Sequence, residues 1–429
     1  MDKTQKGYLI LLMFISPLLG LTAFLKSKNE KVLLFFGVLF FGVAGSLYVY
    51  RPGSDGEAHL SSAIRNYMDM SFGLFLSQCY DLLTLNTTSE TKDIYLHFIS
   101  FVSASLFGVP ELIHVISGLI LGYFFTKSAL LVLQDKLEVK KSGILIAFIV
   151  LFIMDRSLGA LNSIRMWTGM WVFFYGTFSY AITKKKKYLW VILFSIIVHF
   201  SYIIVLFPFI VAYFFRHKTK VITVFYLLSF GLTLNFSTIG NLIPKSSLLE
   251  SQQKHNVIDS DEKAKFFEEK AAIASQVQQN FYITYGEGFY TKYNIVGLSF
   301  ILLFFFNNKT FNNRFNFLLA SGLGLYAFSN IVTFSPSLSG RVKTIAALFI
   351  ITATIQLLFT LNRYKLTSQK LNLLNKCFII FLFLSIPMFL FQISYLIQML
   401  SFFTLILPQI SWLIGDNDFS IRDAISYLS

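Results

Sequence analysis

Three arginines, Arg51, Arg165 and Arg341, each lie beside an apolar run and close to Gly, Ser or Pro residues. An arginine at the edge of a membrane segment is costly unless water, lipid head groups or an anionic partner compensates its charge. The planar guanidinium can also grip a phosphate through two parallel hydrogen bonds. For each arginine alone, a snorkelling anchor is the competing interpretation. Because all three fall on the same predicted side, we expect them to bind a phosphorylated ligand together, with Arg156 beside them.

His199, Asp55 and Glu57 are side chains of a type that can take a proton from an attacking hydroxyl. His199 follows an apolar run, where a histidine bonded to a backbone carbonyl is the structural alternative. Asp55 and Glu57 follow Pro52 and Gly53, where a solvated turn is the alternative. These three residues and Arg165 are the predicted catalytic set.

The composition is that of a membrane protein. Of 429 residues, 55% are hydrophobic and only 14% are charged, and the mean hydropathy is +0.64. Apolar runs of about 18 residues or more recur, which favours helical spans over a barrel. The sequence predicts an all-α polytopic integral membrane protein with about 12 transmembrane helices, or 13 if the tail crosses, in a single membrane domain covering residues 1–429.

We attribute the net charge of +14 to basic residues that orient the helices in the membrane. Lys and Arg fall mostly in short loops between apolar runs, a pattern that orients helices in a membrane and gives no reason to expect nucleic acid. Four consecutive lysines, Lys184 to Lys187, mark the cytoplasmic side most firmly. Cys79 and Cys377 show no metal-ligand spacing and give no reason to expect a disulfide or a redox site. We expect no cofactor.

The positions of the basic turns assign the remaining segments to sides of the membrane. A first span is expected from Tyr8 to Leu25, followed by a cytoplasmic lysine-rich turn. Residues 51–93 and 244–293 are then external, the second as a helical loop, and 398–429 is an interfacial C-terminal segment. Residues 188–215 have basic flanks on both ends, which predicts a hairpin whose turn brings His199 to the outer side. The external loops would form a polar cavity.

The polar residues on the predicted outer side of the membrane indicate what kind of substrate an enzyme of this topology would use. No phosphate-binding loop of the nucleotide type is present, so an enzyme of this topology would use a substrate that is already activated and outside. A lipid-linked sugar pyrophosphate meets both conditions. Arginines aimed at the departing pyrophosphate would stabilise the negative charge that develops in the transition state.

At these residues the sequence resembles the EpsG-like branch of the Wzy-type polymerases, which extend bacterial O-antigen, capsule or exopolysaccharide chains. The resemblance covers most of the chain in order and spacing. It rests on Arg51 with the turn Gly53-Ser54-Asp55, NSIRMW around Arg165, His199-Phe200-Ser201 after a lysine-rich turn, and SGRVK around Arg341. Two positions depart from it: Met166 stands where Gln is common, and Glu57 and His59 stand where a Tyr is common.

The resemblance implies a metal-independent glycosyltransferase, multi-pass in the bacterial inner membrane. It would polymerise undecaprenyl-pyrophosphate-linked oligosaccharide repeat units on the periplasmic or outer face, as in lipopolysaccharide biosynthesis. The growing glycan would pass to the non-reducing-end hydroxyl of a new lipid-linked unit. By analogy Arg165 and Arg341 would hold the pyrophosphates and Arg51 would support them. The expected partners are the lipid-linked oligosaccharide, membrane lipid and a regulator of chain length.

Two alternatives stay open. The first is a membrane glycosyltransferase that uses a polyprenyl-phosphate sugar and in which Asp55 and Glu57 bind metal or act as base. The second is a flippase for lipid-linked oligosaccharide. Transporters tend to carry polar residues at the bilayer midplane and to have repeated halves. Here the charges gather toward one surface and no repeat is visible, which favours the polymerase.

Overall fold

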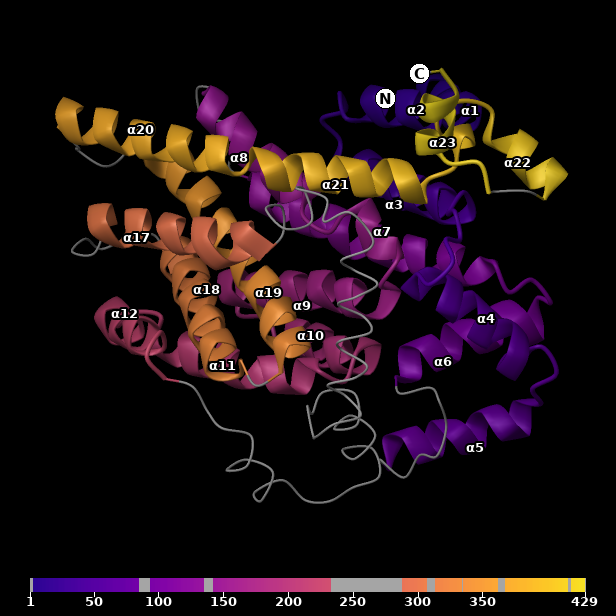
Figure 1. Ribbon diagram of the computed structural model, residues 1–429, viewed down its shortest axis with the longest axis horizontal. Helices are drawn as coiled ribbons and strands as arrows, with labels where there is room; N and C mark the ends of the chain where they lie inside the picture. The colour runs from indigo at the N-terminus through magenta and orange to yellow at the C-terminus, as the bar shows by residue number, and fades with distance from the viewer. Residues whose placement is uncertain are drawn as a thin grey trace. The chain divides into compact units, whose positions relative to one another are not determined.

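The computed structural model describes residues 3–84, 93–134, 142–232, 288–306, 313–333, 335–361, 367–415 and 418–428 (Figure 1). Within these ranges every regular element is a helix and no β-strand occurs. The predicted all-α class is therefore confirmed. Of the predicted external segment 244–293, only residues 288–293 are among those described.

The chain groups into two compact units, which we describe separately. Unit 1 comprises Met1–Gln134, Arg156–Tyr202 and Ile393–Ser429, and unit 2 comprises Asp135–Asp155 and Ile203–Gln392. The prediction of a single membrane domain stays a prediction.

The first part of unit 1 is a series of helices joined by short turns. They are α1 (Lys3–Ile15), α2 (Pro17–Phe24), α3 (Glu30–Ser46), α4 (Asp55–Tyr67), α5 (Phe72–Leu83), α6 (Ile94–Ser100), the π-helix Phe101–Leu106 and α7 (Leu112–Val132). Later segments add the 3-10 helix Leu158–Leu161, α9 (Ile164–Thr183), α10 (Lys187–Val198), the 3-10 helix Phe402–Thr404, α22 (Pro408–Ile414) and α23 (Ile421–Leu428).

Helices α3 and α7 pack extensively against each other, and glycine lets their backbones approach closely. A Cβ on Gly45 would lie 2.1 Å from the carbonyl oxygen of His114, and one on Gly118 would lie 2.4 Å from the carbonyl oxygen of Phe41. Small residues that let backbones approach are typical of helix contacts in membranes. Helix α9 packs on both α7 and α10, and its Trp171 is fully buried.

Unit 2 contains an almost fully buried helix, α19 (Pro336–Thr360). Its elements are α8 (Gly143–Met154), α11 (Tyr202–Phe215), α12 (Thr219–Leu228), the π-helix Tyr290–Asn294, α17 (Ile295–Phe306), α18 (Asn313–Ile331), α19 (Pro336–Thr360) and α20 (Ser368–Leu384), with α21 (Ile386–Met399) leading back to unit 1. Helices α18 and α19 lie side by side (Figure 1). The apolar stretch of α19 is 94% buried, as expected of a helix that is apolar on all faces.

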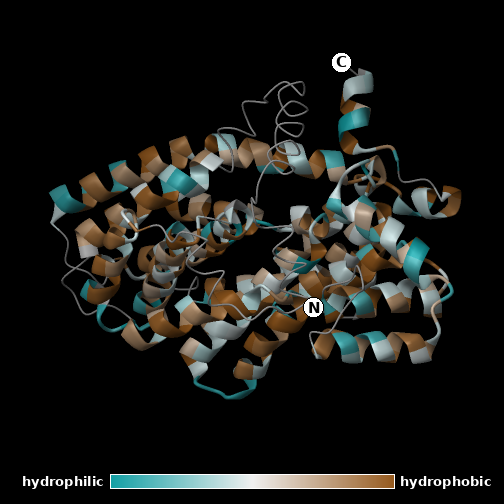
Figure 2. Cartoon of the chain, turned by 60° about the horizontal axis from the view of Figure 1, so that its bottom comes forward, coloured by the Kyte–Doolittle hydropathy of each residue, from teal (hydrophilic) through white to brown (hydrophobic). Residues whose placement is uncertain are grey.

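Four described helical stretches are long and apolar enough to cross a bilayer: Leu112–Val132, Gly143–Leu161, Ser337–Thr360 and Ser368–Met399. Figure 2 shows apolar residues along most helices and hydrophilic residues gathered at turns and helix ends. These features indicate membrane association. The predicted number of about 12 spans stays a prediction.

Two detailed expectations had opposite outcomes. The predicted turn near residues 198–201 is confirmed, because α10 ends at Val198 and α11 begins at Tyr202. The return of α11 alongside α10 and the outer placement of His199 stay predictions. The predicted unbroken first span from Tyr8 to Leu25 is wrong, because the helix stops at Ile15 and restarts at Pro17. Ser16 causes the break: its hydroxyl accepts the Leu19 N–H as an N-cap, and proline suits the first helical position because it has no N–H to satisfy.

Candidate functional site

The central arginine of the sequence analysis pairs with a buried carboxylate. Arg165 Nη1 donates to Asp93 Oδ2 at 2.7 Å, and the side chains are 29% and 2% exposed, respectively. Arg165 lies in the first turn of α9, where a positive charge meets the positive end of the helix dipole. Asp93 compensates both, and the partly exposed guanidinium keeps further N–H donors beyond the one bonded to Asp93.

Asp93 also fastens the turn between α10 and α11. Its Oδ1 accepts the backbone N–H of Phe200 at 2.8 Å. This turn is also bound to α9, because the Tyr202 hydroxyl donates to the carbonyl oxygen of Met166 at 2.9 Å. Gly169 permits this contact, since a Cβ there would lie 2.5 Å from the Tyr202 ring. Asp93, the turn and the start of α9 thus form a closed ring of contacts around Arg165.

The two acidic residues of α4 bond to different hydroxyls. Ser54 caps α4 by accepting the Glu57 N–H, so both carboxylates fall in the favourable first turn. Ser163 Oγ donates to Asp55 Oδ2, which joins Asp55 to the segment that carries Arg165. Glu57 Oε1 instead accepts the Ser61 hydroxyl at 2.7 Å within α4.

His59 lies among the same charges. It is only 8% exposed, and Arg165, Asp55 and Asp93 all act on it electrostatically. Burial lowers the pKa of His59 from near 6.5 to about 4, with Arg165 acting in the same direction and Asp55 and Asp93 opposing. His59 is therefore neutral at pH 7. We call Asp55, His59, Asp93, Ser163 and Arg165 the Arg165 cluster.

Asn162 connects the segments that surround this cluster through three hydrogen bonds. Its Oδ1 accepts the Tyr48 hydroxyl at 2.8 Å and the Gly56 N–H at 3.0 Å, and its Nδ2 donates to the Tyr395 hydroxyl at 2.6 Å. One amide therefore ties together the end of α3, the first turn of α4 and the end of α21. Because Asn162 immediately precedes Ser163, this fixes the entry to α9.

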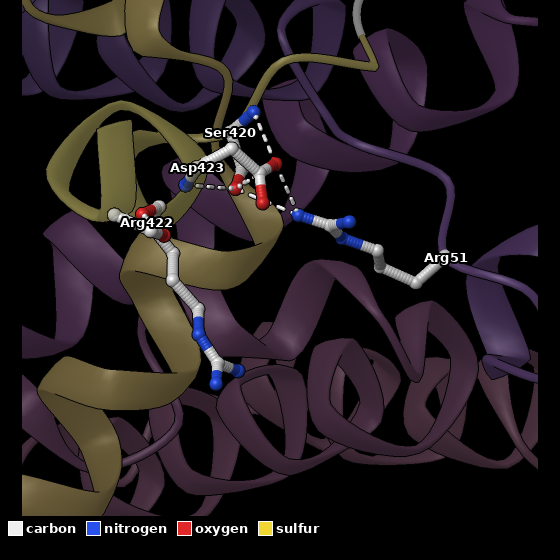
Figure 3. Close-up of polar contacts among 5 residues, drawn as sticks. Arg51, Ser420, Arg422 and Asp423 are labelled. Carbon is white, nitrogen blue, oxygen red and sulfur yellow. Dashed lines mark hydrogen bonds and ion pairs between the residues drawn. The ribbon is translucent and has the colours of Figure 1, made fainter.

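Arg51 is engaged by the C-terminal segment. Its Nη2 lies 2.6 Å from Asp423 Oδ2 and 2.7 Å from Ser420 Oγ, while Arg422 points away from the pair (Figure 3). The side chains of Arg51 and Asp423 are 40% and 35% exposed. Hydrogen bonds from Ser420 lower the pKa of Asp423, and Arg51 adds to this effect. We call Arg51, Ser420 and Asp423 the C-terminal clasp.

The other predicted residues of unit 1 have defined contacts. Arg156 is 9% exposed, with its guanidinium 4.1 Å from the centre of the Trp167 ring, and its carbonyl accepts the Trp171 indole N–H at 2.9 Å. His199 is half-buried at the end of α10, and its Nδ1 lies 2.9 Å from Ser201 Oγ. The bond from Trp171 ties the backbone of Arg156 to α9, and the contact of His199 with Ser201 lies within the turn between α10 and α11. The assignment of Arg156 to pyrophosphate and of His199 to proton transfer stays a prediction.

Arg341 lies in unit 2, in the second turn of α19 and half-buried. The same part of α19 carries Lys343, whose Nζ is 5.8 Å from the centre of the Tyr326 ring and whose charge is repelled by Lys292. The Tyr326 hydroxyl donates to the carbonyl oxygens of Thr291 and Lys292, which fixes the segment that bears Lys292. Positive charge therefore gathers at this end of unit 2.

The structure brings together only part of the predicted set. Asp55 and Arg165 belong to one cluster, whereas Arg51 bonds to the C-terminal segment and the predicted convergence of Arg341 with them stays a prediction. Asp93 and Asn162 were missed by the sequence reasoning. An acidic residue directly before an apolar helix is the signal that could have identified Asp93. Within the described ranges no group of three or more His, Cys, Asp or Glu side chains is arranged to hold a metal ion.

The chain was compared with models of protein families, with curated proteins and with solved structures, and none of the three comparisons found a match.

Proposed function

We propose that this protein is a membrane glycosyltransferase that polymerises lipid-linked oligosaccharide repeat units, with Arg165 as the principal ligand of the pyrophosphate. The observation that carries the proposal is the pairing of Arg165 with Asp93. A buried carboxylate orients the guanidinium while part of it reaches solvent. The N-terminus of the 20-residue helix α9 lies beside it and favours an anion at the same place.

In this reaction a hydroxyl at the non-reducing end of a new lipid-linked unit attacks C1 of the growing glycan. The C1–O bond to undecaprenyl pyrophosphate breaks, and the pyrophosphate leaves with the bonding electron pair. Arg165 stabilises the charge that develops on it, because the donor is already oriented before the reaction begins. The hydroxyl proton passes to a base, for which we assign Asp55, since its bond with Ser163 joins it to the Arg165 segment. His199 and Glu57 remain candidates for the same role.

Asp93 acts as a positioning residue. One of its oxygens accepts from Arg165 and the other from the Phe200 N–H, which favours the orientation of the guanidinium at the start of α9. Positive side chains of unit 2, Arg341, Lys343 and Lys292, are the further candidates for the second pyrophosphate. About 12 spans, a bacterial inner membrane location and an external site belong to the same proposal.

The test is reconstitution of the purified protein in proteoliposomes with the lipid-linked repeat unit of its own organism. A ladder of products, each one repeat longer than the last, is the expected result. Transfer of the lipid-linked unit across the bilayer without new glycosidic bonds would instead identify a flippase. Loss of the ladder on adding a chelator, with recovery on adding a divalent metal, would favour the polyprenyl-phosphate-sugar glycosyltransferase.

A further inference from the structure

Two open grooves include lysines at or beside the turn between α2 and α3. The first groove, of about 360 Å³, has Lys31 in the first turn of α3. Its remaining lining residues are Leu34, Phe35, Val38 and Leu39 of α3 and Leu119 and Tyr123 of α7. The spacing of the α3 residues puts them on one face, and this face runs for roughly 12 Å from Lys31 to Leu39 at the usual rise of a helix.

The second groove has a volume of about 530 Å³. Its walls are Tyr8, Leu9 and Leu12 of α1 and Ala23 of α2, and its remaining lining is the turn itself, including Lys26 and Lys28. Both grooves therefore combine apolar walls with lysines from one short stretch of chain. An apolar channel with a cation at its end fits a ligand that has a hydrocarbon chain and an anionic head.

The charge of the turn is positive overall. Lys26, Lys28 and Lys31 are all exposed, and Glu30 is the one acidic residue among them, so three positive charges minus one negative charge leave +2. The N-terminus of α3 adds a partial positive charge, although Asn29 already accepts the N–H groups of Lys31 and Val32. The balance favours an anion at the turn.

The expected side of the turn between α2 and α3 agrees with binding of a lipid from the cytoplasmic leaflet. The start of α3 lies beside the later half of α7, because Gly37 packs against Thr126 whereas Gly45 packs against His114. Basic turns of this kind face the cytoplasm. Basic pockets between membrane helices on that side bind the head groups of anionic lipids.

We propose that an anionic phospholipid binds at this turn, with its phosphate on Lys26, Lys28 and Lys31 and its acyl chains in the two grooves. The site is independent of the polymerase assignment, since it uses none of the Arg165 cluster. Such a lipid would fill the open face between α3 and α7 and stabilise unit 1.

The test is native mass spectrometry of the purified protein with phosphatidylglycerol or phosphatidylethanolamine added at equal concentrations. We expect phosphatidylglycerol to bind at least about tenfold more tightly, because only its head group is anionic overall. The triple variant Lys26→Gln/Lys28→Gln/Lys31→Gln should lose this preference. If Lys26→Gln/Lys28→Gln/Lys31→Gln does not fold, Lys31→Gln alone should weaken phosphatidylglycerol binding several-fold.

The matched control is Lys185→Gln/Lys186→Gln/Lys187→Gln, which removes the same charge from the turn between α9 and α10 and should change binding less than about twofold. Val38→Trp fills the first groove without changing charge and should weaken phosphatidylglycerol binding. Equal binding of the two lipids, or an equal loss in the control triple, would overturn the proposal. Displacement of the lipid by inorganic phosphate at the same concentration would also overturn it, because the grooves would then contribute nothing.

Discussion

Among the described residues of unit 1, two arginine–aspartate pairs have nearly equal lengths but different surroundings. Arg165 and Asp93 are 2.7 Å apart with the carboxylate 2% exposed, whereas Arg51 and Asp423 are 2.6 Å apart with the carboxylate 35% exposed. Asp93 also receives a backbone N–H from a second segment. The additional bonds of Asp423 come from Ser420, three residues earlier in its own segment.

Distance alone therefore does not measure what an ion pair contributes to stability. Water screens the C-terminal clasp, and exposed pairs contribute between about 0 and 1 kcal/mol. In the Arg165 cluster the buried carboxylate has no water to replace a lost partner, so removing one member is costly. We therefore interpret the Arg165 cluster as a fixed site and the C-terminal clasp as a tether for α23.

The largest expected effect is that of Asp93→Ala. This change leaves Arg165 and the Phe200 N–H without their carboxylate partner, and we expect a loss of about 3–5 kcal/mol in the free energy of unfolding. Asp423→Ala is the matched control and should cost less than about 1 kcal/mol. Chemical denaturation in detergent measures both. Equal losses in the two variants would remove the distinction between the pairs.

The second effect is a pH dependence that His59 gives to the Arg165 cluster. The pKa of His59 is about 4 in the folded protein and about 6.5 when unfolded. Between these values the unfolded chain binds a proton that the folded protein does not. His59 therefore does not reduce the free energy of unfolding above pH 6.5. As the pH falls from 6.5 toward 4, this free energy decreases by at most about 3 kcal/mol. Thermal unfolding of the wild type and His59→Gln, followed from pH 7 to 4, measures the difference. Parallel curves for the two proteins would show that His59 titrates normally.

The smallest effect is the energy of the C-terminal clasp itself. A double-mutant cycle with Arg51→Gln and Asp423→Asn should give a coupling below about 1 kcal/mol that declines as NaCl is raised, because salt screens exposed charges. The parallel cycle with Arg165→Gln and Asp93→Asn should give a larger coupling that salt changes little. A strong, salt-resistant coupling in the C-terminal clasp would show that this pair is shielded from solvent.

The helical elements were largely predictable, since each apolar run in the described ranges became a helix. The break between α10 and α11 was predictable from length and charge together, because basic residues flank a stretch too long for one span. The break at Ser16 was not seen, since a hydroxyl cap followed by proline is a local signal inside a strongly apolar run. Hydropathy averages over such a signal.

The site was less predictable than the helices. Arg165 could be identified because an arginine beside an apolar run needs compensation. Its partner Asp93 lies 72 positions away along the chain, and the Asp423 that engages Arg51 lies 372 positions away. Residue type and spacing cannot identify partners at such separations. The same limit applies to Asn162, whose three bonds join segments that only the fold brings together.

The most direct test of the central claim is the binding of undecaprenyl pyrophosphate to the purified protein in nanodiscs, compared with binding by Arg165→Lys. An ammonium cannot reproduce the two-pronged contact of a guanidinium. We predict saturable binding by the wild type and binding weaker by about 10- to 100-fold in Arg165→Lys, with folding and insertion unchanged. Equal affinity in the two proteins would contradict the assignment of Arg165 to the pyrophosphate.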